Sequence, residues 1–425
     1  MSCAGNKRIT QSQPPVVIAP VINTPPVLVK SFDAGEKFFE DLFKHAPGQF
    51  DNILKHRDDW NVQIIYTQVN RDRDGRPQLK HFYFNGSNPK YFYPASAIKL
   101  PIALLALQKI KELSGKGITR KSTMITEMSY PGQTAEYNDP NTPDGKPNIE
   151  QYIKRIFLVS DNNAYNRLYE FMGQEYINSE LQKKGYNSAQ ILHRLEVFLT
   201  EDQNRHTNAT KFFDNNNQLI YAAPGLYNQQ AFTKRSDYIG KGYFSNGNII
   251  DRPMVFSNKN RLNLSDLNGV LQALVYPETV ESRKRFNITD DDRNFVLKFM
   301  SAYPSESVFP SYDTSVHDAF GKFIMVGGKD ENLRKNVRIF NKVGDAYGQL
   351  VDVACVIDQT NKIEFMLSAA IYCNEDAILN DDKYDYESIG LPFLKNLGNA
   401  IYEYEKTRKK NYQPDLSSFI FSYDK

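Results

Sequence analysis

The sequence has few cysteines, three among 425 residues, and they form no C-x-x-C pair or Cys/His cluster. This argues against a structural zinc site. The apolar runs are far shorter than the roughly 20 residues that a membrane-spanning helix needs. The 52 basic and 50 acidic residues leave a formal net charge of +2, so charge gives no reason to expect binding to nucleic acid or to an anionic membrane surface.

Several catalytic motifs are also missing. The chain has no G-x-S-x-G nucleophile elbow and no H-E-x-x-H zinc motif. Gly240-Lys-Gly242 lacks the third glycine of a dinucleotide-binding loop. The six histidines show no spacing that suggests a Ser-His-Asp set or metal ligands. We therefore expect no metal and no organic cofactor.

The most informative feature that is present is Ser96, which is followed three residues later by Lys99 and then by a long apolar run. Residues three apart lie on one face of a helix, so the hydroxyl and the amine can meet. Burial of this helix would lower the pKa of the lysine and let it act as the base that activates the serine. The alternative is structural: Ser96 caps the helix and Lys99 reaches solvent with its charged end.

Two further motifs follow in the chain, Ser160-Asp-Asn162 and Lys342-Val-Gly344. S-x-x-K, S-D-N and K-T-G in this order are the signature set of class A β-lactamases and penicillin-binding proteins. The chain therefore resembles this family, with a valine in place of the threonine of the third motif. The resemblance extends, with interruptions, from about residue 32 to about residue 406.

The resemblance implies a role for each motif. Ser96 is the expected nucleophile, and Lys99 is the leading base for acylation. Ser160 relays a proton to the leaving group, while Asn162 binds the amide side chain of the substrate and Lys99. Lys342 supports the proton relay and attracts an anionic substrate. The alternative for Ser160-Asp-Asn162 is a simple helix stop, because all three residue types suit one.

The residues beside Lys342 are expected to bind the substrate. Gly344 lets the substrate approach the strand backbone, and the N–H of Asp345 joins that of Ser96 in an oxyanion hole. Val343 lacks the hydroxyl that helps the family hold the β-lactam carboxylate, and Asp345 adds a negative charge nearby. Loss of one charged hydrogen bond costs about 1.5–3 kcal/mol, so we expect weak β-lactam binding.

In class A enzymes a glutamate on a loop after S-D-N activates the water that releases the acyl group. The stretch His193–Glu196 resembles the start of that loop. We align the family's glutamate with Leu199 and take Glu201 as the nearest carboxylate that could replace it as the deacylation base. Glu196 is expected to pair with Arg194 instead. Without a base the acyl-enzyme should persist.

The order of strand and helix patterns predicts an α/β (α+β) chain with one antiparallel sheet flanked by helices. The resemblance implies a class A β-lactamase-like (DD-peptidase-like) fold with an inserted all-helical subdomain. The catalytic domain covers 31–425, with a sheet subdomain at 31–92 and 315–425 and a helical subdomain at 93–314. Residues 203–258, rich in Asn and Tyr, are expected to be an insertion, either a surface elaboration or an arm that gates the substrate.

Residues 1–30 are expected to be a flexible tether, because 12–29 contain five prolines. Cys3 resembles the acylated first residue of a mature bacterial lipoprotein, the alternative being an incidental cysteine. We therefore expect a bacterial cell-envelope protein, periplasmic or on the outer surface, with a possible lipid anchor through Cys3. Cys355 and Cys373 are expected in the core, with a cross-strand disulfide as the alternative.

These observations predict a serine acyl-hydrolase that forms an acyl-enzyme on Ser96. Its substrate is expected to be a small molecule or peptide, either a β-lactam or a peptidoglycan-like amide, and β-lactams should be turned over slowly. The alternatives are a true class A β-lactamase, a D-alanyl peptidase and a non-catalytic cell-wall-binding lipoprotein. Fold resemblance alone does not decide among these.

Overall fold

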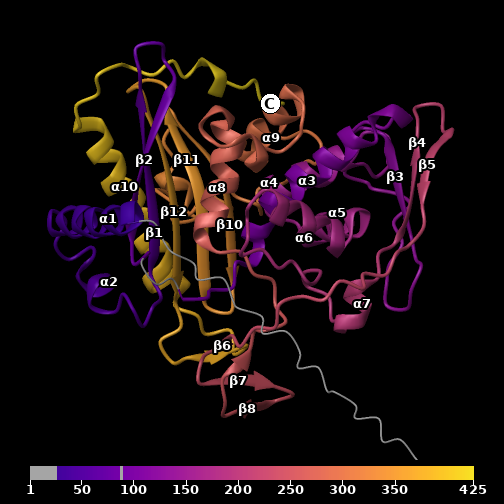
Figure 1. Cartoon of the computed structure of the whole chain (residues 1–425), viewed down its shortest axis with the longest axis horizontal. Helices are drawn as coiled ribbons and strands as arrows, with labels where there is room; N and C mark the ends of the chain where they lie inside the picture. The colour runs from indigo at the N-terminus through magenta and orange to yellow at the C-terminus, as the bar shows by residue number, and fades with distance from the viewer. Residues whose placement is uncertain (1–25, 87–89) are drawn as a thin grey trace, which may run out of the picture.

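The structure, a computed structural model, describes residues 26–86 and 90–425. Its centre is a five-stranded antiparallel sheet in the order β10-β11-β12-β1-β2 (Figure 1). The strands are β1 (Gln63–Arg71), β2 (Pro77–Phe84), β10 (Val337–Ala346), β11 (Gln349–Asp358) and β12 (Ile363–Tyr372). The two ends of the described chain therefore build one sheet, which confirms the predicted arrangement.

One face of the sheet is covered by α1 (Pro26–Lys44), α2 (Asp51–Lys55) and α10 (Leu391–Thr407), which lie together on one side of the sheet in Figure 1. The side chains of a strand alternate between the two faces. Along β11, Leu350, Ala354 and Val356 pack on this face, in the core cluster that contains Phe39, Phe43 and Leu394.

The opposite face carries the larger core, which continues into the helical subdomain. Val351, Val353 and Cys355 of β11 pack there among helix residues. The helices are α3 (Lys99–Glu112), α4 (Ile149–Val159), α5 (Asn162–Met172), α6 (Gln174–Lys183), α8 (Leu264–Val275) and α9 (Asp290–Ser301). In Figure 1, α8 lies against the sheet and α3 to α6 extend away from it. The helix α3 is buried all round, as its apolar run predicts.

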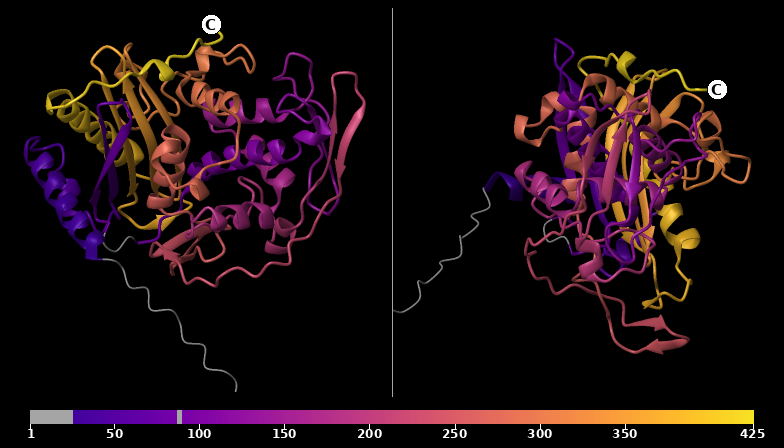
Figure 2. Two further views of the ribbon diagram at one scale, coloured as in Figure 1. Left: turned by 45° about the horizontal axis from the view of Figure 1, so that its top comes forward. Right: turned by 90° about the vertical axis from the view of Figure 1, so that its right-hand side faces the viewer.

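Residues 203–258 contain several short strands, and Figure 2 shows how far they extend from the sheet. β4 (Ala209–Phe213) and β5 (Leu219–Ala223) continue a small sheet begun by β3 (Thr123–Glu127). Further on are β6 (Tyr238–Ile239), β7 (Gly242–Ser245), β8 (Asn248–Ile250) and β9 (Met254–Val255). β7 pairs in parallel with β13 (Ile378–Leu379), which follows the central sheet. The insertion is thus attached to both subdomains.

Some predicted boundaries change. The first helix begins at Pro26, whereas the tether was expected to extend to residue 30, so the predicted tether overlaps this helix. Residues 1–25, with Cys3, lie outside the described residues. Cys355 and Cys373 are buried and unpaired, on opposite faces of the sheet, so the disulfide alternative is wrong. No helix in the described ranges is long and apolar enough to cross a membrane.

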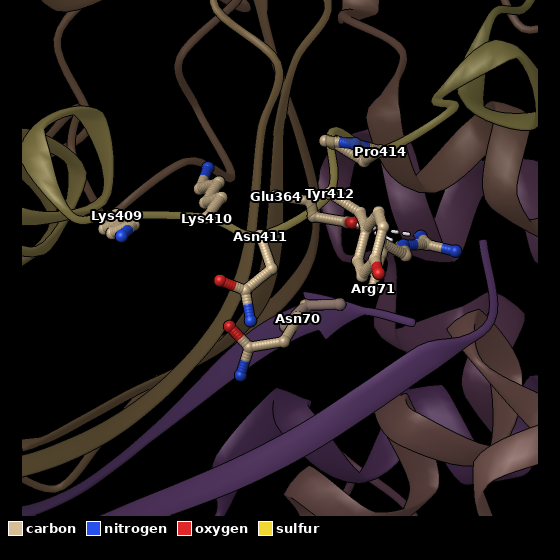
Figure 3. A pocket seen from close by; sticks show the side chains of 9 residues that line it. Asn70, Arg71, Glu364, Lys409, Lys410, Asn411, Tyr412 and Pro414 are labelled. Atoms are coloured by element: carbon tan, nitrogen blue, oxygen red, sulfur yellow. Dashed lines mark hydrogen bonds and ion pairs between the residues drawn. The ribbon is translucent and has the colours of Figure 1, made fainter. Parts of the chain in front are cut away.

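Two buried carboxylates connect neighbouring elements to β1. Glu405 of α10 is fully buried and accepts hydrogen bonds from the Tyr66 hydroxyl of β1 and from Arg408 Nε, the latter at 2.7 Å. Glu364 of β12 accepts two hydrogen bonds from the Arg71 guanidinium of β1, at 2.7 and 2.5 Å, beside the C-terminal tail (Figure 3). Such charge-assisted contacts are strong when both partners are held in place.

We predict that Glu405→Ala lowers the free energy of unfolding by about 3–5 kcal/mol, because it leaves the buried Arg408 charge without its partner. Glu403→Ala is the matched control on the same helix: its carboxylate is exposed and lies 3.8 Å from Lys406, so its removal should cost less than about 1 kcal/mol. Urea unfolding followed by circular dichroism measures both. Equal effects of the two substitutions would contradict the prediction.

Candidate active site

Ser96 lies in a 3-10 turn, Ala95–Ile98, that leads directly into α3. It is the one partly exposed residue between Phe92 and Leu100, so its hydroxyl side faces an opening while its neighbours are buried. Ala95 has a φ of 44°, in the left-handed region. Such a conformation is costly for a residue other than glycine and is maintained only where packing enforces it.

Gly344 of β10 provides that packing. A Cβ atom at this position would lie 2.5 Å from the carbonyl oxygen of Pro94 and 3.0 Å from the backbone nitrogen of Ser96. Only glycine lets the strand approach the serine turn this closely. The approach places the backbone nitrogen of Ser96 beside β10 at Gly344, the residue before Asp345.

Lys99 is completely buried at the start of α3. Its Nζ donates hydrogen bonds to Asn162 Oδ1 at 2.6 Å, to the carbonyl oxygen of Ser160, and to Ser160 Oγ at 3.3 Å. Burial lowers the pKa of Lys99 well below its usual value, and the nearby Lys342 ammonium lowers it further. The site therefore favours the neutral amine that a general base must provide.

Ser160-Asp-Asn162 connects α4 to α5. Ser160 has a φ of 56° and ends α4 in the left-handed conformation. Asp161 caps α5 by accepting a hydrogen bond from the Ala164 N–H at 2.8 Å, and it pairs with Arg155 at 2.8 Å. The tripeptide is thus a helix stop, as the alternative interpretation held, but the same turn directs the polar groups of Ser160 and Asn162 toward Lys99.

Lys342 approaches Ser160 from the sheet side. Its Nζ donates hydrogen bonds to Ser160 Oγ and to the carbonyl oxygen of Val343, both at 2.8 Å. Burial lowers the pKa of Lys342 to about 7. The Ser160 hydroxyl therefore lies between two amines of perturbed pKa, an arrangement that suits proton transfer and is typical of functional sites.

Ser96 and Asn162 line a cavity of about 640 Å³ between the subdomains. The other side chains that line it belong to three segments, His193–Phe198, Asp345–Tyr347 and Asn380–Tyr384, together with Tyr93, Ala95 and Lys259. The Ser96 hydroxyl makes no hydrogen bond with any residue that the structure describes, so the expected direct contact with Lys99 is not formed here.

The predicted substrate-binding residues separate into two groups. Asn162 and Asp345 line the cavity, whereas Val343 and Gly344 do not. Val343 points to the opposite face of the sheet and is 4% exposed, in the core beneath α10. Asp345 is exposed, but its position within the cavity walls desolvates it and raises the pKa of its carboxyl, against the opposing effects of Lys342 and Lys99.

The expected pairing of Glu196 with Arg194 is wrong. The buried Arg194 pairs instead with Glu170 of α5, at 2.8 Å, which leaves the exposed Glu196 without an ion pair among the described residues. Glu196 lines the Ser96 cavity. Glu201, our candidate base, lies in α7 (Glu201–Arg205), where it is 63% exposed and pairs with Arg205 at 3.0 Å.

Glu201 and Leu199 line a neighbouring cavity rather than the one that contains Ser96. The structure therefore moves the candidate deacylation base from Glu201 to Glu196. Its position immediately after His193-Arg-Leu195 was a usable signal, since it is the first carboxylate of that loop. The sequence favours a pairing of Glu196 with Arg194, two residues earlier. This pair does not form, because the Arg194 side chain is buried in the core.

Comparison with known proteins identifies a related family. Residues 49–236 match the model of a family described as the Beta-lactamase enzyme family, and the match includes Ser96, Lys99, Ser160 and Asn162. The resemblance is confirmed. The predicted class, a β-lactamase-like serine hydrolase, is confirmed with it, as is the fold class. No curated protein sequence matches the chain.

Solved structures similar to this one include a β-lactamase from Francisella tularensis, with 16% identity over 87% of this chain and 99% of that one and a TM-score of 0.48. A class A β-lactamase from Clostridium kluyveri has 15% identity over 84% and 98%, with a TM-score of 0.45. An acyl-enzyme complex of a PBP-A mutant with penicillin G has 13% identity over 88% and 96%, with a TM-score of 0.46.

Within the described residues, no group of three or more His, Cys, Asp or Glu side chains is placed to hold a metal ion.

We predict that Gly344→Ala lowers the rate at which Ser96 is labelled by a fluorescent penicillin at least tenfold, because the new methyl group would overlap backbone atoms of the serine turn. Gly115→Ala is the control, since nothing lies within 4 Å of a Cβ there. In-gel fluorescence and thermal melting follow labelling and stability. Labelling of Gly344→Ala at the wild-type rate would show that the close approach does not position Ser96.

Proposed function

We propose that this protein is a serine acyl-hydrolase that cleaves a β-lactam or a cell-wall-peptide-like amide through an acyl-enzyme on Ser96. The observation that carries the proposal is the Ser160 hydroxyl, held 2.8 Å from Lys342 Nζ and 3.3 Å from Lys99 Nζ, with Lys99 three residues after the partly exposed Ser96. A buried neutral amine next to a serine is the arrangement that nucleophilic catalysis needs.

In this mechanism Lys99 accepts the proton of the Ser96 hydroxyl as its oxygen attacks the substrate carbonyl. The N–H groups of Ser96 and Asp345 stabilise the negative charge that develops on the carbonyl oxygen. The carbon–nitrogen bond then breaks, and Ser160 passes a proton to the departing nitrogen while Lys342 supports the relay. Asn162 holds the amide side chain of the substrate.

Deacylation requires a base that activates water. Glu196 is the candidate, because it lines the Ser96 cavity and has no ion pair with a described residue that would occupy it. The sequence predicted slow turnover partly because the deacylation base was expected to be missing. With Glu196 as the base, we attribute slow turnover of β-lactams to weak binding instead. The carboxylate of Asp345 lines the cavity that a β-lactam carboxylate would enter and would repel it, whereas Val343 faces the opposite side of the sheet and cannot contribute to this effect.

The alternatives are a true class A β-lactamase, a D-alanyl peptidase and a non-catalytic cell-wall-binding protein. The buried contacts among Lys99, Ser160 and Lys342 favour catalysis over binding alone, because two desolvated lysines are costly to retain without a purpose. The lipid anchor at Cys3 and the cell-envelope location stay predictions, since Cys3 lies outside the described residues.

We predict that incubation with benzylpenicillin gives a covalent adduct on Ser96 and none in Ser96→Ala. In Glu196→Gln the adduct should accumulate and hydrolysis should fall by at least a hundredfold, because deacylation loses its base. Glu201→Gln is the matched control and should behave as the wild type. Intact mass and absorbance assays measure both. An adduct that clears as fast in Glu196→Gln as in the wild type would rule out Glu196.

The lowered pKa of Lys99 predicts the pH dependence of acylation. The reactive form is the neutral amine, so the rate should rise with pH and level off as the amine loses its proton. Since burial lowers the pKa, that rise should be complete well below pH 10.5. Stopped-flow acylation across pH 5 to 10.5, with melting curves at each pH, tests this. A rate that continues to rise up to pH 10.5 would mean that Lys99 is not the base.

A further inference from the structure

A second cavity, of about 570 Å³, adjoins the one that contains Ser96. The two share His193, Val197, Phe198 and Lys259 among their walls. The remaining wall comes largely from the insertion, through residues 231–235 and through Val255, Ser257 and Asn258. The insertion, whose role the sequence left open, therefore builds a cavity that adjoins the one lined by the candidate nucleophile.

The second cavity is cationic. Arg205, Lys234, Arg235 and Lys259 line it, against one carboxylate, that of Glu201. His193 adds no positive charge at neutral pH, because burial lowers its pKa to about 4.

Not all of this charge is available to a ligand. Arg205 pairs with Glu201 at 3.0 Å, and Arg235 pairs with Asp237 at 3.2 Å. Lys234 is exposed and has no ion pair with any described residue. The only polar contact of the Lys259 Nζ among those residues is the Tyr347 hydroxyl, at 3.4 Å. The ammonium groups of Lys234 and Lys259 therefore have no carboxylate partner among the described residues and can bind an anionic ligand.

The Ser96 cavity has the opposite character. Glu196, Asp345 and Asp382 line it. Among the described residues that line it, Lys259, at the junction with the second cavity, is the one cation without an ion pair, since Arg194 pairs with Glu170. Phe198 stands fully exposed between the two cavities. A substrate that reaches both will therefore be drawn into one orientation, with any negative group of its acyl side chain on the side of the insertion.

We propose that the second cavity is an acyl-side-chain subsite for carboxylates, so that the preferred substrates are extended amides with an anionic group on the acyl side, held by Lys234 and Lys259. The proposal rests on the proposed function, since it assumes that the acyl group is attached to Ser96. It gives the insertion the role of a specificity element, with Phe198 as the aromatic surface that the side chain crosses.

Three penicillins that share one ring system test this: carbenicillin has a side-chain carboxylate, benzylpenicillin a neutral side chain and ampicillin an ammonium. Second-order acylation rates from intact mass should decrease in that order for the wild type. Lys234→Glu should lower the carbenicillin rate about five- to tenfold relative to benzylpenicillin and raise the relative rate for ampicillin. Lys241→Glu makes the same charge change within the insertion, outside both cavities, and should leave the order unchanged.

The outcomes separate this proposal from the one on which it rests. Acylation of Ser96 with the same preference in Lys234→Glu as in the wild type would overturn the subsite and leave the hydrolase intact. An equal change in Lys241→Glu would also overturn it, because the effect would then come from net charge. Failure of all three penicillins to acylate Ser96 would overturn the subsite together with β-lactams as substrates in the proposed function.

Discussion

The burial of two lysines against one serine hydroxyl is the constraint on which the rest of this molecule depends. Lys99 comes from the helical subdomain and Lys342 from the sheet, and both Nζ atoms donate to Ser160 Oγ. The contact that assembles the candidate catalytic groups is therefore also a contact that holds the subdomains together. Neither lysine can be desolvated unless oxygen atoms satisfy its N–H groups, and Asn162 Oδ1 and the carbonyl oxygen of Val343 contribute two of these.

The backbone around this contact is correspondingly unusual. Ala95 and Ser160 both have a positive φ, and Gly344 approaches the serine turn closely enough that a methyl group would not fit. The two positive φ values cost free energy locally, and they occur at Ala95, the residue before Ser96, and at Ser160 itself. Strain that clusters at one site and is sustained by the packing around it is what a preorganised active site requires.

Some of this could be predicted from the sequence because the signals are local. The strand patterns near both ends of the chain and the apolar run after Lys99 correctly predicted the sheet and the buried helix. The burial of Val343 away from the cavity was also within reach, since Lys342 and Gly344 share one face of the strand and the residue between them must face the other. We assigned it to the site on the resemblance alone.

Other features depend on contacts between distant segments. Arg194 could have paired with Glu196 two residues away, but the buried Arg194 side chain pairs instead with Glu170, which lies on α5. The two-residue pairing of β7 with β13 connects segments more than 130 residues apart and leaves no periodicity to detect. A pattern in the sequence identifies which residue types are available, whereas the tertiary structure decides which of them remain free to act.

The loop from His193 to Leu199 contributes residues to both cavities. It separates the acidic cavity from the cationic one, with Glu196 lining the first, Leu199 the second and Phe198 both. A ligand group that enters the second cavity must therefore contact the same short loop that carries the candidate deacylation base. In this fold, side-chain specificity and the release of the acyl group are consequently not independent properties, because one segment of backbone positions the residues for both.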